Sequence, residues 1–531
     1  MKDVGNSVFR RYFIIIYAAV KAAEWRISMK KRLVAALMAS VMVMGALTGC
    51  GAKTGGTSTG EVDENGVTKD DITLTYWHYE DETTINLLAE AFMKKYPNIK
   101  VECKQISDMS TDLSAAANSG TFPDVFSGTD SDTALANEYW RDITEYVEND
   151  PDMSNMMTTI KDYGIGKFDT DRWFGLPTWY QPSAIFIDKN VISKLNLEMP
   201  RTDWTWDEML QLIKDATVDD RSGMKYYGLG YYNRLDSLYG IAACSSAERA
   251  IKGEFGFDGT DFDLSYWAVG EQQFADLILA GYVAPQQNTQ AMEDWSGDWG
   301  AWFGATGHVA VFSEGFWTYQ NLWGTDGYQD TYGLDIVPYV TPNVVDEKEH
   351  NVIANMYIGG VSTSCKHPYE AYLLLKFMGI GTDGWNARMD IYEDSSITNA
   401  SGVPLKNSNM PVPMTLDKTV WDRYKALFPQ DAEHKAYWDD YFDSITRPVP
   451  YGWYSIAGYW NFCDQYFNNI GIHDLVGTGK AKAADYTDEA TEQANYYHAE
   501  AMLSYFGPTG YNVLSDEEIA QYEAVTNAFG K

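Results

Sequence analysis

A regular alternation of strand-like and helix-like segments begins at Asp71 and limits the fold more than any other feature of the sequence. "ITLTYW" has the composition of a strand, "TTINLLAEAFMKKY" carries apolar residues at helical spacing, and "IKVECKQI" follows as a second strand. "STDLSAAANSG" predicts a helix that ends at Gly120, and "PDVFSG" predicts a third strand. This order is typical of a parallel sheet covered by helices, so we expect an α/β fold.

The segment before this alternation has the three parts of an export signal. From Met29, "MKKRLVAALMASVMVMGALTG" has a basic start, an apolar run and a small-residue end. The apolar run is shorter than the ~20 residues that a membrane-spanning helix needs. We interpret residues 1–49 as the signal region, with translation starting at Met29 or, alternatively, with residues 1–28 as an extended signal.

A single cysteine stands directly after this signal. Leu47-Thr48-Gly49-Cys50 resembles the bacterial lipobox, in which the cysteine receives a diacylglycerol and becomes the new N-terminus. Residues 51–70 have no apolar periodicity and are rich in Gly, Thr and Asp. We therefore expect Cys50 to be lipidated and residues 50–70 to tether a domain to the extracellular face of the cytoplasmic membrane, in a Gram-positive bacterium.

Acidic residues dominate the charge of the chain. Its 531 residues include 75 Asp and Glu against 40 Lys and Arg. Loss of residues 1–49 removes eight basic and two acidic residues, which leaves a formal charge of −41. This field repels nucleic acids and anionic membrane surfaces, so we expect no nucleic-acid partner. The mature length exceeds what one hydrophobic core usually organises, which predicts two or more lobes.

The remaining cysteines do not indicate a disulfide framework. Cys103, Cys244, Cys365 and Cys463 lie far apart and lack C-x-x-C spacing. Dense disulfides are typical of short secreted chains, so buried thiols are expected here, while export leaves a bridge among the four open.

Six segments, taken in order, resemble the solute-binding proteins of ABC importers, specifically the sugar-binding family 1 that includes the maltose-binding proteins. They are "LTYWHYEDETTINLLAEAFMKKYPNIKVE", "AAANSGTFPDVFSG", "DRWFGLPTWYQPSAIFIDKNV", "WTWDEMLQLIKDAT", "FGATGHVAVFSEGFWTYQNL" and "IGGVSTSCKHPYEAYLLLKFM". The resemblance covers most of residues 71–500. No single segment is specific, but the order of the six behind a lipobox makes the set strong.

The resemblance implies a two-lobed periplasmic-binding-protein-like fold of type II, with the ligand cleft between lobes joined by hinge strands. Transferred to this sequence, the N-terminal lobe holds residues 71–178 and 352–398. The C-terminal lobe holds residues 185–345 and 400–505. Residues 506–531 fit the pattern less well and are expected as a C-terminal tail.

The sequence contains no motif that indicates catalysis, a cofactor or a metal. "GIGTDG" (379–384) satisfies G-x-G-x-x-G but follows a helix, which predicts a helix C-cap and turn. "GTGK" (477–480) lacks the first glycine of a P-loop, and the seven histidines have no zinc spacing. We therefore expect no enzyme activity, no cofactor and no metal.

A sugar presents C–H faces and a rim of hydroxyls, so its site needs aromatic rings beside carboxylates and amides. The chain is rich in rings, with 18 Trp and 37 Tyr. In open α/β sheets such sites lie beyond the carboxyl ends of strands. The candidates are Trp77, Tyr79, Glu80 and Asp81 after the first strand, Asp130 after the third, Trp179 and Tyr180 at the lobe crossover, Tyr232 and Asn233 after "YGLGY", Trp317 in "SEGFW", and Trp453 in "VPYGWYS".

Each candidate has a structural alternative. Trp77 and Trp317 can pack in a core, and the acids after the first and third strands can cap the helices that follow. Trp317 is the best single candidate because its loop position agrees with the resemblance. Arg388, near "NARMD", is a separate candidate to pair with an anionic ligand.

The sequence therefore predicts a monomeric, lipid-anchored receptor. We expect it to capture a carbohydrate, specifically an oligosaccharide, and to present it to ABC permease subunits. A surface glycoside hydrolase is the alternative, and it would need two carboxylates at a defined separation. A third alternative keeps the fold but binds a peptide, polyamine or polyol. The sequence does not identify the ligand.

Overall fold

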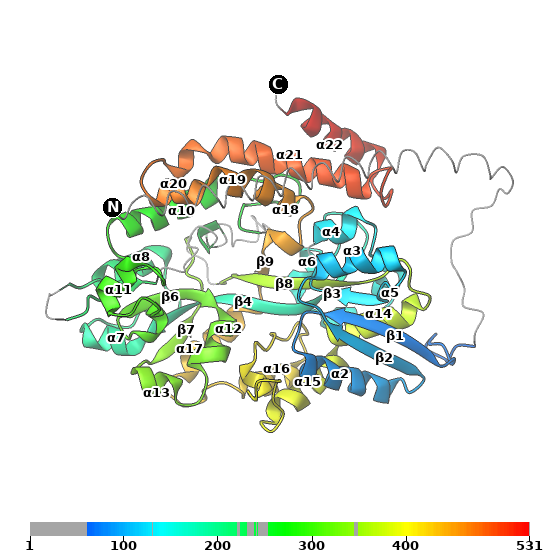
Figure 1. Cartoon of the computed structure of the whole chain (residues 1–531), viewed down its shortest axis with the longest axis horizontal. Coiled ribbons are helices and arrows are strands. Elements are labelled where there is room, and N and C mark those ends of the chain that lie inside the picture. Colours follow the sequence, from blue (N-terminus) through cyan, green and yellow to red (C-terminus); the bar gives the residue numbers. More distant parts are fainter. Residues whose placement is uncertain are drawn as a thin grey trace, which may run out of the picture. The chain divides into compact units, whose positions relative to one another are not determined.

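Nine strands run through the part of the chain that the computed structural model describes, which is residues 61–129, 131–219, 223–230, 238–240, 242, 253–344 and 349–529. Seven are hydrogen-bonded in the order β2-β1-β3-β8-β4-β6-β5, while β7 pairs with β4 and β9 with β8 (Figure 1). The bounds are β1 Ile72–His78, β2 Ile99–Gln105, β3 Val125–Ser127, β4 Leu176–Asp188, β5 Tyr227–Leu229, β6 Val309–Gly315, β7 Ile336–Tyr339, β8 Val352–Val361 and β9 Pro448–Pro450.

The first three strands form the parallel sheet that the sequence predicts. β1 pairs with β2 in parallel from Ile72↔Ile99 onward, and with β3 in parallel through Tyr76↔Val125. The connecting helices begin at the expected places: Asp81 caps α2 and Asp108 caps α3. The left-handed Gly120 ends α3, as its position after "AAANS" predicts. This α/β arrangement is confirmed.

The rest of the sheet is mixed, because strand β4 changes partners along its length. Its first half pairs antiparallel with β8, from Leu176↔Gly359 to Pro182↔Ala354. From Ser183 onward it pairs antiparallel with β6 and β7 instead. β4 thus connects the strands on the two sides of the molecule, and β8 returns beside it to reach β3.

Helices before and after β4 pack on both parts of this sheet. The helical elements up to β7 are α2 Glu82–Lys95, α3 Met109–Ser119, α4 Ser131–Ala136, α5 Thr144–Glu148, η2 Pro151–Asn155, α6 Thr158–Asp162, α7 Lys189–Lys194, α8 Trp206–Asp215, α10 Ser265–Leu279, α11 Gln290–Ser296, η4 Phe303–Ala305, α12 Phe316–Thr318, η5 Tyr319–Trp323 and α13 Tyr328–Tyr332. Those after β8 are α14 Pro368–Met378, α15 Thr382–Glu393, η6 Leu405–Asn407, α16 Lys418–Lys425, α17 Lys435–Ser444, η7 Gly452–Tyr454, α18 Tyr459–Phe462, η8 Cys463–Phe467, α19 Asn468–Ile470, α20 Ile472–Gly477, η9 Ala483–Asp485, α21 Thr487–Phe506 and α22 Asp516–Ala528.

The buried apolar side chains form three clusters. The largest joins β1–β3, α2, α14 and α15 to residues beyond β4 such as Phe312 and Trp438. A second lies around the later half of β4, with α7 and α8. The third lies between α10 and the helices α18–α21. The chain length predicted more than one core, and the burial pattern agrees.

The last residues of the chain form an element that the sequence interpretation missed. Residues 506–531 were expected as a tail, but α22 occupies Asp516–Ala528 and begins with a capping box between Ser515 and Glu518. None of its residues is buried, and it lies against α21. A polar helix without a buried face gives no apolar periodicity, which is why the pattern did not reveal it.

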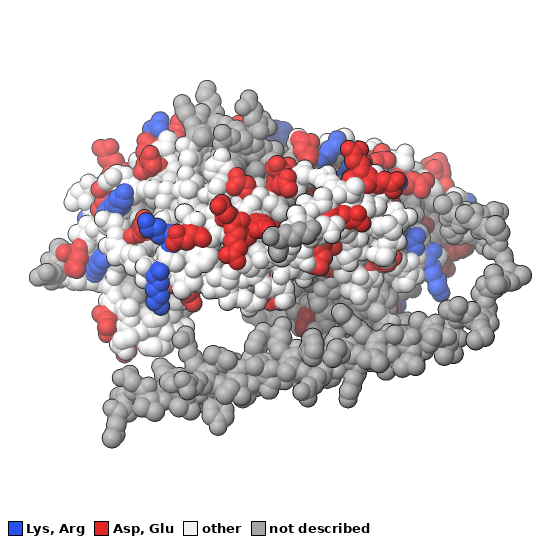
Figure 2. Space-filling model, turned by 90° about the horizontal axis from the view of Figure 1, so that it is seen from above, with Lys and Arg blue, Asp and Glu red and all other residues white. Residues whose placement is uncertain are grey.

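The surface of the described residues reflects the strong negative charge of the sequence. In Figure 2, Asp and Glu are spread over most of the visible face, and Lys and Arg are sparser. No helix in the described ranges is both long and apolar enough to cross a membrane. Cys103 and Cys365 are free thiols and Cys463 is buried, while Cys244 lies outside the described residues.

Candidate functional site

The loop between β1 and α2 contains three of the predicted ligand contacts. Asp81 is the N-cap of α2, and its carboxylate accepts hydrogen bonds from the backbone N–H of Thr84 (3.0 Å) and from its hydroxyl (3.3 Å). This is the capping role that the sequence left as an alternative. Tyr79, two residues earlier, is 48% exposed. The cap fixes the loop and leaves the Tyr79 ring facing solvent.

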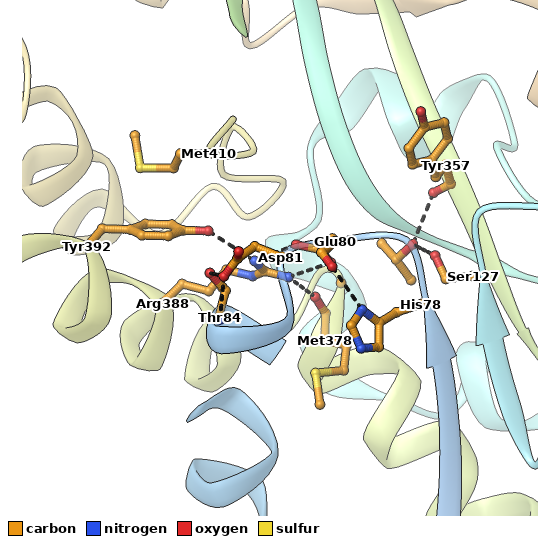
Figure 3. A network of polar contacts seen from close by, with 12 residues as sticks. His78, Glu80, Asp81, Thr84, Ser127, Tyr357, Met378, Arg388, Tyr392 and Met410 are labelled. Carbon is orange, nitrogen blue, oxygen red and sulfur yellow. Dashed lines mark hydrogen bonds and ion pairs between the residues drawn. The ribbon is translucent and has the colours of Figure 1, made fainter. Parts of the chain in front are cut away.

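Glu80 forms an ion pair with Arg388. Arg388, from α15, donates to both of its carboxylate oxygens, at 2.8 and 2.9 Å (Figure 3). The same guanidinium donates to the carbonyl of Met378 (3.0 Å) and to the hydroxyl of Tyr392 (3.2 Å). The side chains of Glu80 and Arg388 are 8% and 1% exposed. The guanidinium is thus committed to protein partners, whereas Glu80 also lines the small cavity beside Tyr79, and its contact with a ligand stays a prediction.

The ion pair is largely shielded from solvent, and this shifts the pKa values of the groups around it. Burial raises the pKa of Glu80, and the guanidinium of Arg388 opposes that effect. Burial also lowers the pKa of His78 to about 4, so its imidazole is neutral at pH 7. The Nδ1 of His78 lies 3.2 Å from the Glu80 carbonyl and donates to it in the matching tautomer. The pair and the histidine together hold the β1–α2 loop in place.

Four aromatic rings meet above this loop, and we call them the aromatic quartet: Tyr79, Trp179, Tyr357 and Tyr454. Trp179 on β4 stacks on Tyr357 on β8, with ring centroids 4.7 Å apart and an angle of 16°. Tyr79 and Tyr454 each meet Tyr357 edge-on, at 5.3 and 5.0 Å. Trp179 is buried, whereas Tyr357 and Tyr454 are half-buried and Tyr79 is exposed. The quartet therefore offers ring surface on a firmly packed base.

A small polar cavity of about 60 Å³ adjoins the quartet at Tyr79 and Trp179. Asp81, Ser408 and Asn409 also line it. The side-chain oxygen of Asn409 is buried and has no hydrogen-bond partner among the described residues. Asn409 adopts a left-handed backbone with φ of 54°, which asparagine tolerates better than most residues. A cavity of this size accommodates water or a hydroxyl group, and the unpaired oxygen can accept a hydrogen bond from it.

The remaining candidates lie outside the quartet. Trp77 on β1 packs against the core, and the ammonium of Lys104 lies 4.2 Å from the centroid of its ring. Tyr180 is fully buried, and its hydroxyl donates to the carbonyl of Ile445 (2.8 Å). Because side chains alternate along a strand, Tyr180 points to the opposite face from Trp179. The expected ligand contact of Tyr180 conflicts with this burial.

Two tryptophans of the later chain are partly accessible. Trp317 lies on α12, where its ring folds over Gly315; a Cβ on that glycine would approach the ring to 2.1 Å. Trp453, in η7 beside Tyr454, is 37% exposed and its ring lies 4.9 Å from that of Trp460. Neither ring belongs to the quartet, and their contact with a ligand stays a prediction. Asp130, Tyr232, Asn233 and Cys50 lie outside the described residues.

The sequence interpretation missed several residues of interest. Tyr357 lies within a strand that looked purely structural, and Tyr454 directly follows the Trp453 that was chosen. Glu314 lies near the carboxyl end of β6, half-buried, and accepts from the Thr318 hydroxyl at 3.3 Å. Burial raises its pKa to about 7. Its place at a strand end, three residues before Trp317, was a signal available in the sequence.

The described residues contain no group of three or more His, Cys, Asp or Glu side chains that could hold a metal ion. The two carboxylates nearest the quartet in sequence, Glu80 and Asp81, are occupied by Arg388 and by the start of α2. What the arrangement offers a ligand is ring surface, an unpaired amide oxygen and a small polar cavity. These groups suit binding.

The protein is thus an α/β protein whose sheet has a partner-changing strand and whose ring surface is built on β4, β8 and the loop after β1. The family model described as bacterial extracellular solute-binding protein matches residues 77–379, more than half of the chain, and the chain belongs to this family. Comparison with curated proteins gave no match.

Solved structures with the same fold are two-lobed, maltose-binding-protein-like solute-binding proteins. The ABC substrate-binding protein Lmo0181 from Listeria monocytogenes, in complex with cycloalternan, is 18% identical, with a TM-score of 0.56 over 80% of this chain and 98% of that one. The cyclic alpha-maltosyl-1,6-maltose binding protein from Arthrobacter globiformis is 16% identical, with a TM-score of 0.56 over 80% of this chain and 98% of that one. The sugar-binding protein MalE from Xanthomonas citri is 14% identical, with a TM-score of 0.56 over 81% of this chain and 98% of that one. The fold expected from the sequence is thus confirmed.

Proposed function

We propose that this protein captures an oligosaccharide outside the cell and delivers it to an ABC permease. The observation that carries the proposal is the aromatic quartet, in which the exposed Tyr79 ring and the half-buried Tyr357 and Tyr454 rings present flat apolar surface. The C–H face of a pyranose stacks on such surface, and its hydroxyls suit the polar cavity beside Asn409. Family membership supports the receptor role.

The strong negative charge argues for a neutral ligand. The formal charge of the whole chain is −35, and the one buried arginine at the site is paired with Glu80. An anionic ligand would meet the repulsion of this charge, and the buried arginine described at the site is already paired. The structural neighbours bind cycloalternan and cyclic alpha-maltosyl-1,6-maltose, so oligosaccharides built from glucose are the first probes to try.

Two lobes that enclose the ligand are part of the proposal. The N-terminal lobe holds residues 71–178 and 352–398, and the C-terminal lobe residues 185–345 and 400–505. The change of partners in β4 at Pro182 and Ser183 falls between these ranges and supports the division. A strand that belongs to both parts of a sheet is a natural hinge.

The test of the site is titration calorimetry of the mature chain with cycloalternan and maltotetraose. Tyr79→Ala removes an exposed ring and should raise Kd about fivefold, because a stacked ring contributes on the order of 1 kcal/mol. Tyr332→Ala is the matched control, since Tyr332 is 47% exposed on α13 and touches no quartet residue. Equal Kd values for the two variants would contradict the proposed site.

Chromatography of the same mixtures should detect no hydrolysis product, and a product would favour the glycoside hydrolase.

The lipid anchor is proposed at Cys50. Its thiol follows Leu47-Thr48-Gly49 and precedes the tether, and two acyl chains hold a protein at a membrane stably. Cys50→Ser should move the protein from the membrane fraction to the medium or leave it unprocessed. Unchanged fractionation would contradict the anchor but leave the binding proposal intact.

A further inference from the structure

A second cavity of about 720 Å³ lies on the side of α2, α5 and α14, at the right of Figure 1, and shares no lining residue with the quartet. We call it the tyrosine groove. The rings of Tyr96, Tyr146 and Tyr369 line it, with Lys376 beside them. Ligand pockets in proteins commonly enclose about 300–1,000 Å³, so the groove has room for a ligand.

The rings of the groove are fixed by packing and by hydrogen bonds. The centroids of Tyr146 and Tyr369 lie 5.5 Å apart, and both rings rest on the buried Tyr372, at 5.6 and 6.5 Å. The hydroxyl of Tyr369 donates to the Asn65 carbonyl at 3.1 Å. Tyr146 and Tyr369 remain half-buried, so part of each ring is accessible. A ring held in this way loses little conformational entropy when a ligand stacks on it.

The polar groups of the groove are also arranged before any ligand arrives. Lys376 donates to Asp150 and Asp152 at 2.6 and 2.9 Å, and the Tyr372 hydroxyl donates to Asp150 at 2.9 Å. Asp150 is 7% exposed, whereas Asp152 is 42% exposed and reaches the groove. Carboxylate oxygens of this kind accept hydrogen bonds from hydroxyl groups.

The charge at the rim favours a neutral ligand. Lys376 is neutralised by two carboxylates, and Lys95 pairs with Asp383. Asp63 and Glu145 also line the groove, and no ion pair with a described residue neutralises either one. The excess is negative, as it is for the whole chain, so phosphates and acidic polysaccharides are disfavoured.

One wall of the groove comes from the start of the described chain. A bridge between Val62 and Thr68 closes a short hairpin, which is held to α14 by the bond from the Thr68 N–H to Glu370 (2.7 Å). This hairpin lies within residues 50–70, the range expected as a flexible tether, so the last part of that range is folded against α14. A ligand in the groove would therefore lie beside the point at which the chain leaves for its proposed anchor.

We propose that the tyrosine groove binds the sugar rings of a neutral glycan chain at a second site, independent of the aromatic quartet. Tyr146 and Tyr369 stack on the C–H faces, and Asp152, Glu145 and Asn149 at the rim accept from the hydroxyls. Stacking on rings tolerates different linkages, so the groove should bind several tetrasaccharides weakly instead of one tightly.

The test is saturation-transfer NMR of the mature chain with maltotetraose, cellotetraose and chitotetraose, each up to 20 millimolar. Tyr146→Ala should reduce the weak signal about fivefold or more and leave any tight binding seen by calorimetry unchanged; Tyr79→Ala should do the reverse. Tyr332→Ala should change neither. Should Tyr146→Ala fail to fold, Tyr96→Ala removes the ring on the other wall. No weak signal with any of the three glycans, or a signal that survives the ring's removal, would overturn the proposal.

The variant Glu145→Gln tests whether the rim acts as a hydrogen-bond acceptor. An amide oxygen still accepts a hydrogen bond from a hydroxyl, so the glycan signal should stay within about twofold of wild type. A loss of fivefold or more would contradict this role of Glu145, and the proposed recognition of the glycan would be wrong. Failure of calorimetric binding at the quartet would contradict the proposed function alone, because the weak signal is measured separately.

Discussion

At the scale of single residues, the site depends on a contact that no local pattern reveals. Asp81 could be predicted as a cap because its partner is three residues away. The ion pair of Glu80 could not be predicted, because Arg388 lies 308 residues further along the chain. The pair covers most of the Glu80 side chain, while Tyr79 beside it is exposed.

Arg388→Ala should destabilise the protein strongly. It leaves the Glu80 carboxylate buried without its partner, and breaking a buried ion pair costs about 3–5 kcal/mol. Urea denaturation followed by fluorescence measures the change. The control is Arg423→Ala, whose ion pairs with Asp390 and Glu393 are more exposed and contribute about 1 kcal/mol or less. Comparable losses for the two variants would contradict the role given to the Glu80–Arg388 pair.

Glu314 should make stability depend on pH. Burial raises its pKa from 4.5 in its ordinary environment to about 7, so between these values the native state holds a proton that the unfolded state has released. The contribution of Glu314 to the free energy of unfolding is therefore full below about pH 4.5 and declines as the pH rises toward 7. Glu314→Gln removes this decline.

The measurement for Glu314 compares unfolding free energies at pH 5 and pH 8. Relative to wild type, Glu314→Gln should gain up to about 3 kcal/mol at the higher pH, because each tenfold change in proton affinity corresponds to about 1.4 kcal/mol. Glu517→Gln, on the exposed helix α22, should show no such gain. A constant difference between wild type and Glu314→Gln across this range would show that Glu314 titrates normally.

At the scale of elements, local signals predicted the start of the fold well. The strand and helix pattern after Asp71 needed only alternation, helical spacing and end signals, and β1, α2, β2, α3 and β3 appear in that order. The mixed pairing of β4 did not follow from sequence, because both halves of that strand are almost wholly buried and read as one apolar run. Pairing partners depend on distant segments.

Gly360→Ala tests how closely β8 packs against Trp140, which lies in the segment between α4 and α5. A Cβ at this position would lie 2.1 Å from the ring of Trp140, which is fully buried and has no room to move. Overpacking of this kind costs about 1–3 kcal/mol, so the melting temperature should fall by several degrees. Gly477→Ala, at the end of α20 with nothing within 4 Å, should leave it unchanged or slightly higher. An unchanged melting temperature for Gly360→Ala would mean that Trp140 has another position available.

At the scale of the whole molecule, the quartet connects the two proposed lobes. Tyr79 and Tyr357 belong to the ranges of the N-terminal lobe, Trp179 lies at the crossing, and Tyr454 belongs to the C-terminal lobe. In this proposed division, the edge-on contact of Tyr357 with Tyr454, at 5.0 Å, joins a residue of one lobe to a residue of the other. The sequence predicted a crossing near Trp179, but the contact itself arises only from packing.

Small-angle scattering of the mature chain tests this closure. If a bound oligosaccharide contacts both lobes, it favours the closed form, and the radius of gyration should fall on ligand addition. Moving an equilibrium from mostly open to mostly closed requires about 10⁴-fold tighter binding to the closed form, so weak ligands should close it only in part. Tyr454→Ala removes the contact across the crossing and should increase the radius without ligand and raise Kd. Tyr332→Ala should match wild type in both measurements. An identical radius with and without a saturating ligand would contradict hinge closure, even if the quartet binds sugar.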